Sequence, residues 1–464
     1  MARDPLTALS ALDGRYARKL SSVADAFSET ALIKWRVFVE IEYFLLLSKY
    51  GVVREITAAE KKNLKAIPEQ FELSSGDNES INAAQRVKDF EATTHHDVKA
   101  VEYYIREEFE KTTLKDCTSY IHFGITSEDV NNLAYRKMVQ TGLQQDIFPK
   151  LHTLLKSLAD FSEQHSTLTM LARTHGQPAV PTTLGKEFSV FATRLLYCVQ
   201  RLHKLELTGK CNGAVGNFQA MVIAKPEVDW SSLSKELVTN LGFTFSTTTT
   251  QINPPDDFIS IFAELHHING ILLDLSQDIW RYISDNWLVQ KGKENHVGSS
   301  TMPQKINPIE FENAEGNLTM ANGMFEVFMR KLPVSRLQRD LSESTVLRNI
   351  GSAFGYSSLA YQSLQKGLLQ LAPNEQIIHS ALHENYAILL EAWQTWARTT
   401  GDAKAYETAA KLGKQKHISV EDWKEITKDA DKRIQNLTPD TYVGLAREIA
   451  NQSVTEVRQF LATK

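Results

Sequence analysis

The stretch FISIFAELHHINGILLDLSQDIWRYISDNWL, Phe258 to Leu288, places apolar residues on one helical face at every third or fourth position. At 1.5 Å per residue such a helix is about 45 Å long, whereas an ordinary globular helix has about 11–12 residues. A helix of this length can bury its apolar face only against helices of similar length, so the stretch predicts an extended helix bundle. The face consists of Phe258, Phe262, Leu265, Ile268, Leu272, Leu275, Ile279 and Tyr282.

Three further amphipathic patterns predict helices, from Phe148 to Leu158, from Leu184 to Leu205 and from Phe311 to Phe328. Strand signals are scarce, and only Phe243–Ile252 is β-prone. We therefore expect an all-α protein with a long central helix bundle and smaller terminal helical domains. Interruptions of the pattern suggest an N-terminal helical domain at 1–113, the central bundle at 114–365 and a C-terminal helical domain at 366–464. The apolar faces are wide, which predicts additional burial against other subunits.

The composition excludes several functional classes. The 464 residues include 51 basic and 56 acidic side chains, a formal net charge of −5, with no local basic run, so no nucleic-acid partner is expected. The three cysteines, Cys117, Cys198 and Cys211, are widely spaced and indicate a reduced, intracellular protein. Neither a secretory signal nor a run of 18 uncharged apolar residues is present, so we expect a cytoplasmic protein without membrane spans.

One loop interrupts the helical patterns with unusual chemistry. The segment GSSTMPQKINP, Gly298 to Pro308, is rich in Gly, Pro and hydroxyl side chains and carries a single cation, Lys305. Asn307 can cap the following helix, Pro308 suits its first position, and Glu310 completes a capping-box spacing. The free N–H groups of that helix end, together with Lys305, favour an anion there. A flexible loop with an incidental lysine is the simpler alternative.

Two other segments contain histidines in polar surroundings. His175 lies in a second predicted loop, LARTHGQPAVPTTLG, just before a predicted helix, and imidazole is the side chain best suited to proton transfer near neutral pH. His95 and His96 are adjacent in FEATTHHDVKAVEYY, and on a helix they would point to different faces, so they are not expected to bind one metal ion together. The sequence has no H-E-x-x-H, P-loop or G-x-G-x-x-G motif, so neither a metal nor a cofactor is expected.

The residues from Gly298 to Glu312 match every fixed position of G-S-S-x-M-P-x-K-x-N-x-x-x-x-E, and the chain thereby resembles the fumarase/aspartase superfamily. Within it, five further segments are similar to the adenylosuccinate lyase family. Gln304 departs from that pattern and is typical of argininosuccinate lyases, which leaves that activity as the alternative. The five segments are DGRYA (13–17), TTHHDVKAVEYY (93–104), FGITSEDVNNLA (123–134), RTHGQP (173–178) and LPVSRLQRDLSESTVLRNIG (332–351).

The resemblance implies a β-elimination that releases fumarate, from adenylosuccinate to give AMP and from succinyl-aminoimidazole-carboxamide ribotide, in purine nucleotide biosynthesis. It also implies the catalytic residues: His175 as the acid toward the leaving nitrogen, Glu312 as its orienting partner, Ser299 as the base and Lys305 as a stabilising cation. No cofactor takes part in such a reaction. The adjacent Ser300 cannot be separated from Ser299 on physical grounds.

The resemblance further implies an anionic nucleotide substrate and a homotetramer whose active sites are shared between subunits. Arginine is suited to bidentate contacts with phosphate and carboxylate groups. The rival interpretations are a fumarase and a helical scaffold without catalytic activity. The implied substrate-binding residues are Arg15, Tyr16, His95, His96, Asp97, Thr126, Ser127, Gln251, Met302, Asn307, Arg339, Ser344, Thr345, Val346, Leu347 and Arg348.

Overall fold

A computed structural model describes residues 5–72, 79–291, 302, 305–414 and 418–464. The expected all-α class is confirmed, since strands occur in the described chain only as three two-stranded pairs. Contacts divide the chain into two units, and each is assembled from three stretches of sequence. Unit 1 contains 1–150, 200–269 and 317–359, and unit 2 contains 151–199, 270–316 and 360–464. The three-domain division at 113 and 365 stays a prediction.

The predicted long helices are present, and each contributes residues to both units. The stretch from Phe258 forms a helix of 29 residues. Its apolar face is buried except for the partly exposed Tyr282. By length and composition alone this helix could cross a membrane, but half of its most apolar window is buried within the molecule, as in a core helix. The predicted helices are α7 (Phe148–Gln164), α8 (Leu184–Leu202), α11 (Asp256–Ser284) and α12 (Ile309–Lys331). A fifth long helix, α14 (Ile350–Gln370), was not predicted and also has residues in both units.

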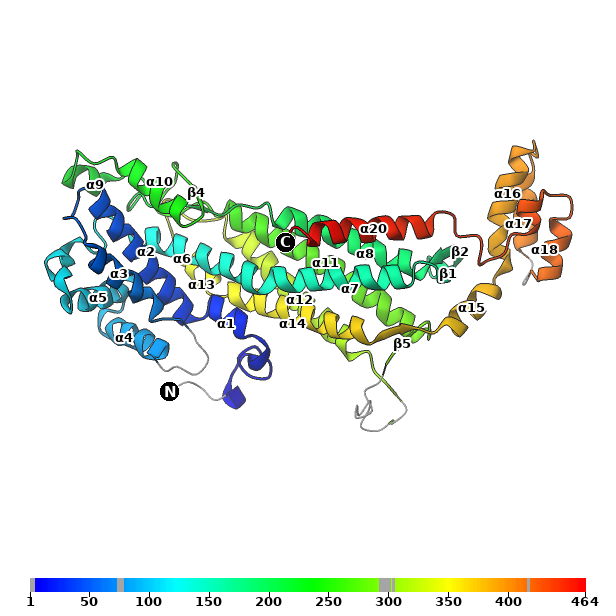
Figure 1. Ribbon diagram of the computed structural model, residues 1–464, viewed down its shortest axis with the longest axis horizontal. Coiled ribbons are helices and arrows are strands. Elements are labelled where there is room, and N and C mark those ends of the chain that lie inside the picture. Colours follow the sequence, from blue (N-terminus) through cyan, green and yellow to red (C-terminus); the bar gives the residue numbers. More distant parts are fainter. Residues whose placement is uncertain (1–4, 73–78, 292–301, 303–304, 415–417) are drawn as a thin grey trace. The chain divides into compact units, whose positions relative to one another are not determined.

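In unit 1, α2 packs against both α3 and α6, and α4 packs against α5 (Figure 1). A short parallel pair joins β3 (Thr208–Gly209) to β4 (Thr244–Phe245). The β-prone segment after Phe243 therefore forms a strand of only two residues. The remaining α-helices of unit 1 are α1 (Ser21–Phe27), α2 (Glu29–Lys49), α3 (Ala58–Glu69), α4 (Glu79–Thr94), α5 (Asp97–Glu110), α6 (Ser127–Gly142), α9 (Gln219–Ala224), α10 (Trp230–Asn240) and α13 (Ser342–Leu347).

In unit 2, β1 (Thr169–Thr174) and β2 (Gln177–Thr183) form an antiparallel hairpin, and β5 (Leu288–Gln290) pairs with β6 (Leu371–Pro373). The helices α7 and α8 approach so closely that a Cβ added at Gly185 would lie 2.2 Å from the carbonyl oxygen of Ser162. The remaining helices of unit 2 are α15 (Glu375–His383), α16 (Leu390–Thr399), α17 (Ala405–Gly413), α18 (Val420–Ile426), α19 (Lys432–Gln435) and α20 (Ala446–Leu461).

A buried ion pair fixes α6 to the first turn of α11 within unit 1. Arg136 donates two hydrogen bonds to Asp257, with Nε–Oδ2 at 2.8 Å and Nη2–Oδ1 at 2.9 Å. The two side chains are only 3% and 1% exposed. The guanidinium also lies over the ring of Phe258, 4.6 Å from its centroid. Because removal of one partner leaves the other charge buried, this pair is costly to break.

We predict that Arg136→Met lowers the free energy of unfolding by about 3–5 kcal/mol, because the carboxylate of Asp257 would remain buried without its counter-ion. Urea unfolding followed by circular dichroism measures this change. Arg86→Met is the matched control, since Arg86 pairs with Glu107 at the surface, and its unfolding midpoint should not move. Equal midpoints for the two variants would show that the buried pair does not hold α6.

Candidate anion-binding site

Helix α6 is buried along almost its whole length, although it carries charged and amide side chains. The partners of these side chains come from distant segments of unit 1. Asn132 accepts a hydrogen bond from the backbone N–H of Lys210, and Asp129 pairs at 3.0 Å with the ammonium of Lys210, which is fully buried. Asp129 also accepts the backbone N–H of Thr126 at 2.8 Å. The N-terminus of α6, with Thr126 and Ser127, is thereby held in a fixed position.

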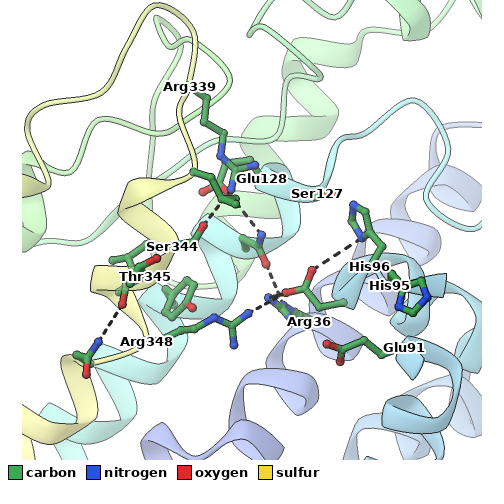
Figure 2. Close-up of a pocket in the computed structure, with 16 residues that line it drawn as sticks. Arg36, Glu91, His95, His96, Ser127, Glu128, Arg339, Ser344, Thr345 and Arg348 are labelled. Carbon is green, nitrogen blue, oxygen red and sulfur yellow. Dashed lines mark hydrogen bonds and ion pairs between the residues drawn. The ribbon is translucent and has the colours of Figure 1, made fainter. Parts of the chain in front are cut away.

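Next to this helix end, Arg36 of α2 joins α6 to the N-terminus of α5 (Figure 2). Its Nε donates to Oδ1 of Asn131 at 2.9 Å, and its Nη2 donates to Oδ2 of Asp97 at 2.7 Å. The same Asp97 oxygen accepts a hydrogen bond from Nη2 of Arg348 at 3.1 Å. Burial alone would raise the pKa of Asp97, but Arg36, the backbone N–H of Val98 and Arg348 outweigh it and lower that pKa. Asp97 is therefore an anion held between two guanidinium groups.

A third arginine, Arg339, lies beside the first turn of α6. It pairs with Glu128 at 3.2 Å and with Glu343 at 2.9 Å, and it donates to Oγ of Ser344 at 3.2 Å. Burial raises the pKa of Glu128 to about 7, against the opposing attraction of Arg339. Burial also raises the pKa of Glu343. Near neutral pH this corner consequently carries less negative charge than its two carboxyl groups suggest.

These groups surround a cavity of about 670 Å³ (Figure 2). Nine of the expected substrate-binding residues line it: His95, His96, Asp97, Ser127, Arg339, Ser344, Thr345, Leu347 and Arg348. They come from the start of α5, the start of α6 and the region of α13. Sequence reasoning missed seven other lining residues, which are Arg36, Glu91, Glu128, Asn131, Tyr135, Leu341 and Asn349.

The cavity has the chemistry of an anion site. Three arginines face it, all of them oriented by acidic or amide partners within the protein. The N-terminus of α6, a helix of 16 residues, adds backbone N–H groups and the positive end of a helix dipole. Arginines held in this way lose little conformational freedom when a ligand binds, and this favours the binding of a planar or tetrahedral oxyanion.

Five of the expected binding residues in unit 1 are not among the residues that line the cavity. Thr126 and Val346 adjoin lining residues in sequence, and Oε1 of Gln251 accepts a long hydrogen bond of 3.5 Å from Arg339. The guanidinium of Arg15 lies 5.9 Å from the ring centroid of Tyr16. Neither Arg15 nor Tyr16 lines this cavity within the chain.

The two adjacent histidines lie at the start of α5. The Nδ1 atom of His96 accepts the backbone N–H of Lys99 at 3.2 Å and thereby caps the helix, which leaves Nε2 for another partner. His95 precedes it with φ of 54°, a left-handed conformation that is uncommon outside glycine. The left-handed residue lets the chain reverse at this point before α5 begins.

His175 occupies the turn of the β1–β2 hairpin in unit 2. Thr174 pairs with Gln177, so His175 and Gly176 form a two-residue turn, with φ of 53° and 74°. Positive φ at both central positions is the geometry of a type I′ turn, which suits a tight hairpin. The sequence suggested a loop here, whereas the structure has strands on both sides of an exposed His175.

The signature segment is only partly described. Ser299, Ser300 and Gln304 lie outside the described residues, as does most of the loop. Met302 and Lys305 are exposed, and Asn307 is partly exposed, just before α12 begins at Ile309. In unit 2, the indole N–H of Trp280 donates to Oε1 of Glu312 at 3.2 Å. The proposed pairing of Glu312 with His175 stays a prediction.

Comparison with known proteins gives a consistent result along the whole chain. Residues 14–323 match a family described as lyase, and residues 335–443 match one described as adenylosuccinate lyase C-terminal. An adenylosuccinate lyase of Legionella pneumophila (strain Corby) is 44% identical, covering 97% of this chain and 99% of that protein. The adenylosuccinate lyase of Escherichia coli (strain K12) is 40% identical, covering 96% and 98%.

The fold has known relatives as well. The structure is similar to that of a fumarate lyase from Mesorhizobium sp. BNC1, with a TM-score of 0.76 over 93% of this chain and 97% of that chain, at 16% identity. At this identity the likeness shows the shared helical fold alone. The matches in sequence confirm the resemblance seen in the signature segment. The chain belongs to the adenylosuccinate lyase family within the fumarase/aspartase superfamily, and it is a fumarate-releasing carbon–nitrogen lyase.

Proposed function

We propose that the chain converts adenylosuccinate to fumarate and AMP, and that the cavity of unit 1 binds the anionic nucleotide part of the substrate. The observation that carries the proposal is the set of Arg36, Arg339 and Arg348 around one cavity, beside the N-terminus of α6. The phosphate is the group of the nucleotide that such donors recognise best. The succinyl-aminoimidazole-carboxamide ribotide carries the same phosphate and is proposed as the second substrate.

The elimination needs a base for a weakly acidic C–H proton beside a carboxylate and an acid for the departing nitrogen. We assign the base to Ser299 and the acid to His175, with Lys305 stabilising the serine alkoxide and Glu312 supporting the charge of the imidazole. A general acid or base contributes about 10²–10⁴-fold to the rate. His175 suits its role because an exposed imidazole on a tight turn can meet substrate without rearrangement of the surrounding strands.

We further propose a cytoplasmic homotetramer in which each active site takes residues from more than one chain. Apolar side chains are exposed along the helices that pass through both units, which is typical of a surface that other subunits cover. They include Val190 and Tyr197 on α8, Trp280 on α11, Met320 and Val327 on α12, and Leu369 on α14. In this arrangement, Arg15 and Tyr16 contribute to the active site of a neighbouring chain.

The main alternative is the argininosuccinate lyase reaction, which Gln304 favours. The two activities are separated by measuring fumarate release from adenylosuccinate and from argininosuccinate in parallel. We expect release from adenylosuccinate only, because argininosuccinate has no phosphate for the arginines of the cavity. A scaffold without activity would release fumarate from neither.

We predict that Arg348→Met weakens AMP binding by about 10- to 150-fold, because a hydrogen bond to a charged group contributes about 1.5–3 kcal/mol. Isothermal titration calorimetry with AMP measures this change. Arg86→Met is the control, since the side chain of Arg86 is 47% exposed and that of Arg348 is 45% exposed. If Arg348→Met binds AMP with unchanged affinity, the phosphate does not bind in this part of the cavity.

We also predict that two inactive variants restore activity to each other. His175→Ala and Ser299→Ala chains, mixed in equal amounts, unfolded and reassembled, should regain about a quarter of wild-type activity if each site takes these residues from different chains, since half of the chains supply each one. Fumarate release measures the activity, and sedimentation measures assembly. Reassembled oligomers that remain inactive would contradict shared sites.

A further inference from the structure

A cluster of potential metal ligands lies in unit 2, among residues to which the proposed reaction assigns no role. It consists of His379 and His383 on α15 and Asp440 in the segment between α19 and α20. One ligand atom from each residue lies within 4.8 Å of the other two. Sequence patterns do not reveal this cluster, because Asp440 is 57 residues from His383 and belongs to no recognised motif.

The three side chains are held close together. His379 and His383 are one helical turn apart, and their rings stack with centroids 4.0 Å apart and an interplanar angle of 24°. The Nε2 atom of His383 lies 2.7 Å from Oδ2 of Asp440. The hydroxyl of Thr169, at the start of β1, donates to the backbone carbonyl of Asp440 at 3.3 Å and helps to hold that segment beside α15. The donors therefore come from two segments that the fold keeps together.

The donor set suits one class of metal ion. Imidazole nitrogen favours Zn²⁺, Ni²⁺ and Cu²⁺, whereas Mg²⁺ and Ca²⁺ prefer oxygen ligands alone. In a tetrahedral zinc site with bonds of about 2.0–2.1 Å, neighbouring donors are about 3.3 Å apart. To reach that geometry, the two stacked imidazole rings must rotate about their side-chain bonds so that both face one ion. The side chains are accessible to solvent, which permits such rotation: Asp440 is 43% exposed and His383 is 29% exposed. Water can occupy the remaining position.

We propose that His379, His383 and Asp440 form a binding site for one divalent transition-metal ion of the zinc class. The ion joins the end of α15 to the segment that leads into α20. Since it binds the folded state, the metal stabilises this part of unit 2 by RT ln(1 + c/Kd), where c is its free concentration. The ordinary alternative is an ion pair of His383 and Asp440 with a neighbouring imidazole, and it predicts no metal binding.

The test uses the full chain, freed of metal by dialysis against a chelator and then dialysed against zinc chloride. Bound zinc per chain is measured for the wild type, for the double variant His379→Ala/His383→Ala and for Asp440→Asn. The wild type should bind one zinc ion more than the double variant. Asp440→Asn keeps the shape of the side chain and should lower the affinity for zinc, because one ligand is lost. Circular dichroism checks that this variant is folded.

The matched control is His266→Ala, because His266 also pairs with a carboxylate, Glu326, at 3.3 Å. This variant should retain the zinc content of the wild type. Equal zinc content in the wild type, the double variant and Asp440→Asn would overturn the proposal. Magnesium chloride in place of zinc should not be retained by the cluster, and magnesium retention that depends on His379 and His383 would equally contradict the assigned class of metal.

Discussion

The candidate site depends on a single buried guanidinium, that of Arg36. It lies on α2 with a side chain only 3% exposed, and it donates both to Asn131 on α6 and to Asp97 at the start of α5. Asp97 in turn holds Arg348. The buried guanidinium of Arg36 therefore sets the relative positions of α2, α5 and α6. Through the carboxylate of Asp97 it also positions Arg348 at the cavity. A charge in this position is stabilising only while its partners remain, since unpaired buried charges cost several kcal/mol.

The same principle extends along α6, which would be a weak core helix if its polar side chains lacked partners. These side chains bond to three distant segments of unit 1: Glu128 to Arg339, both Asp129 and Asn132 to Lys210, and Arg136 to Asp257. These bonds specify the position of the helix more narrowly than apolar packing alone, which tolerates sliding. The result is an N-terminus of α6 that points into the cavity beside arginines that are already oriented. Preorganisation of this kind lowers the entropy lost on binding an anion.

Periodicity alone predicted the parts of the fold that follow from helical repeats. The faces of α8, α11 and α12 were recognisable because their burial depends on spacing. The hairpin around His175 was missed, because the flanking segment contains two prolines, Pro178 and Pro181, which lower the strand signal. Family motifs located His95, Ser127 and Arg339, but they did not identify Arg36, Glu128 or Asn131, whose roles depend on distant partners. A usable signal was present, since Arg36 and Glu40 are charged residues within the strongly apolar run of α2.

The most direct test of the account is a double-mutant cycle on AMP binding with Arg36→Met, Arg348→Met and the combined variant. If Arg36 acts through Asp97 to orient Arg348, the two changes are not independent, and their coupling should be about 0.5–3 kcal/mol by calorimetry. The double variant should then bind AMP only slightly more weakly than Arg348→Met. Additive losses, within about 0.5 kcal/mol, would contradict the central role of the buried guanidinium.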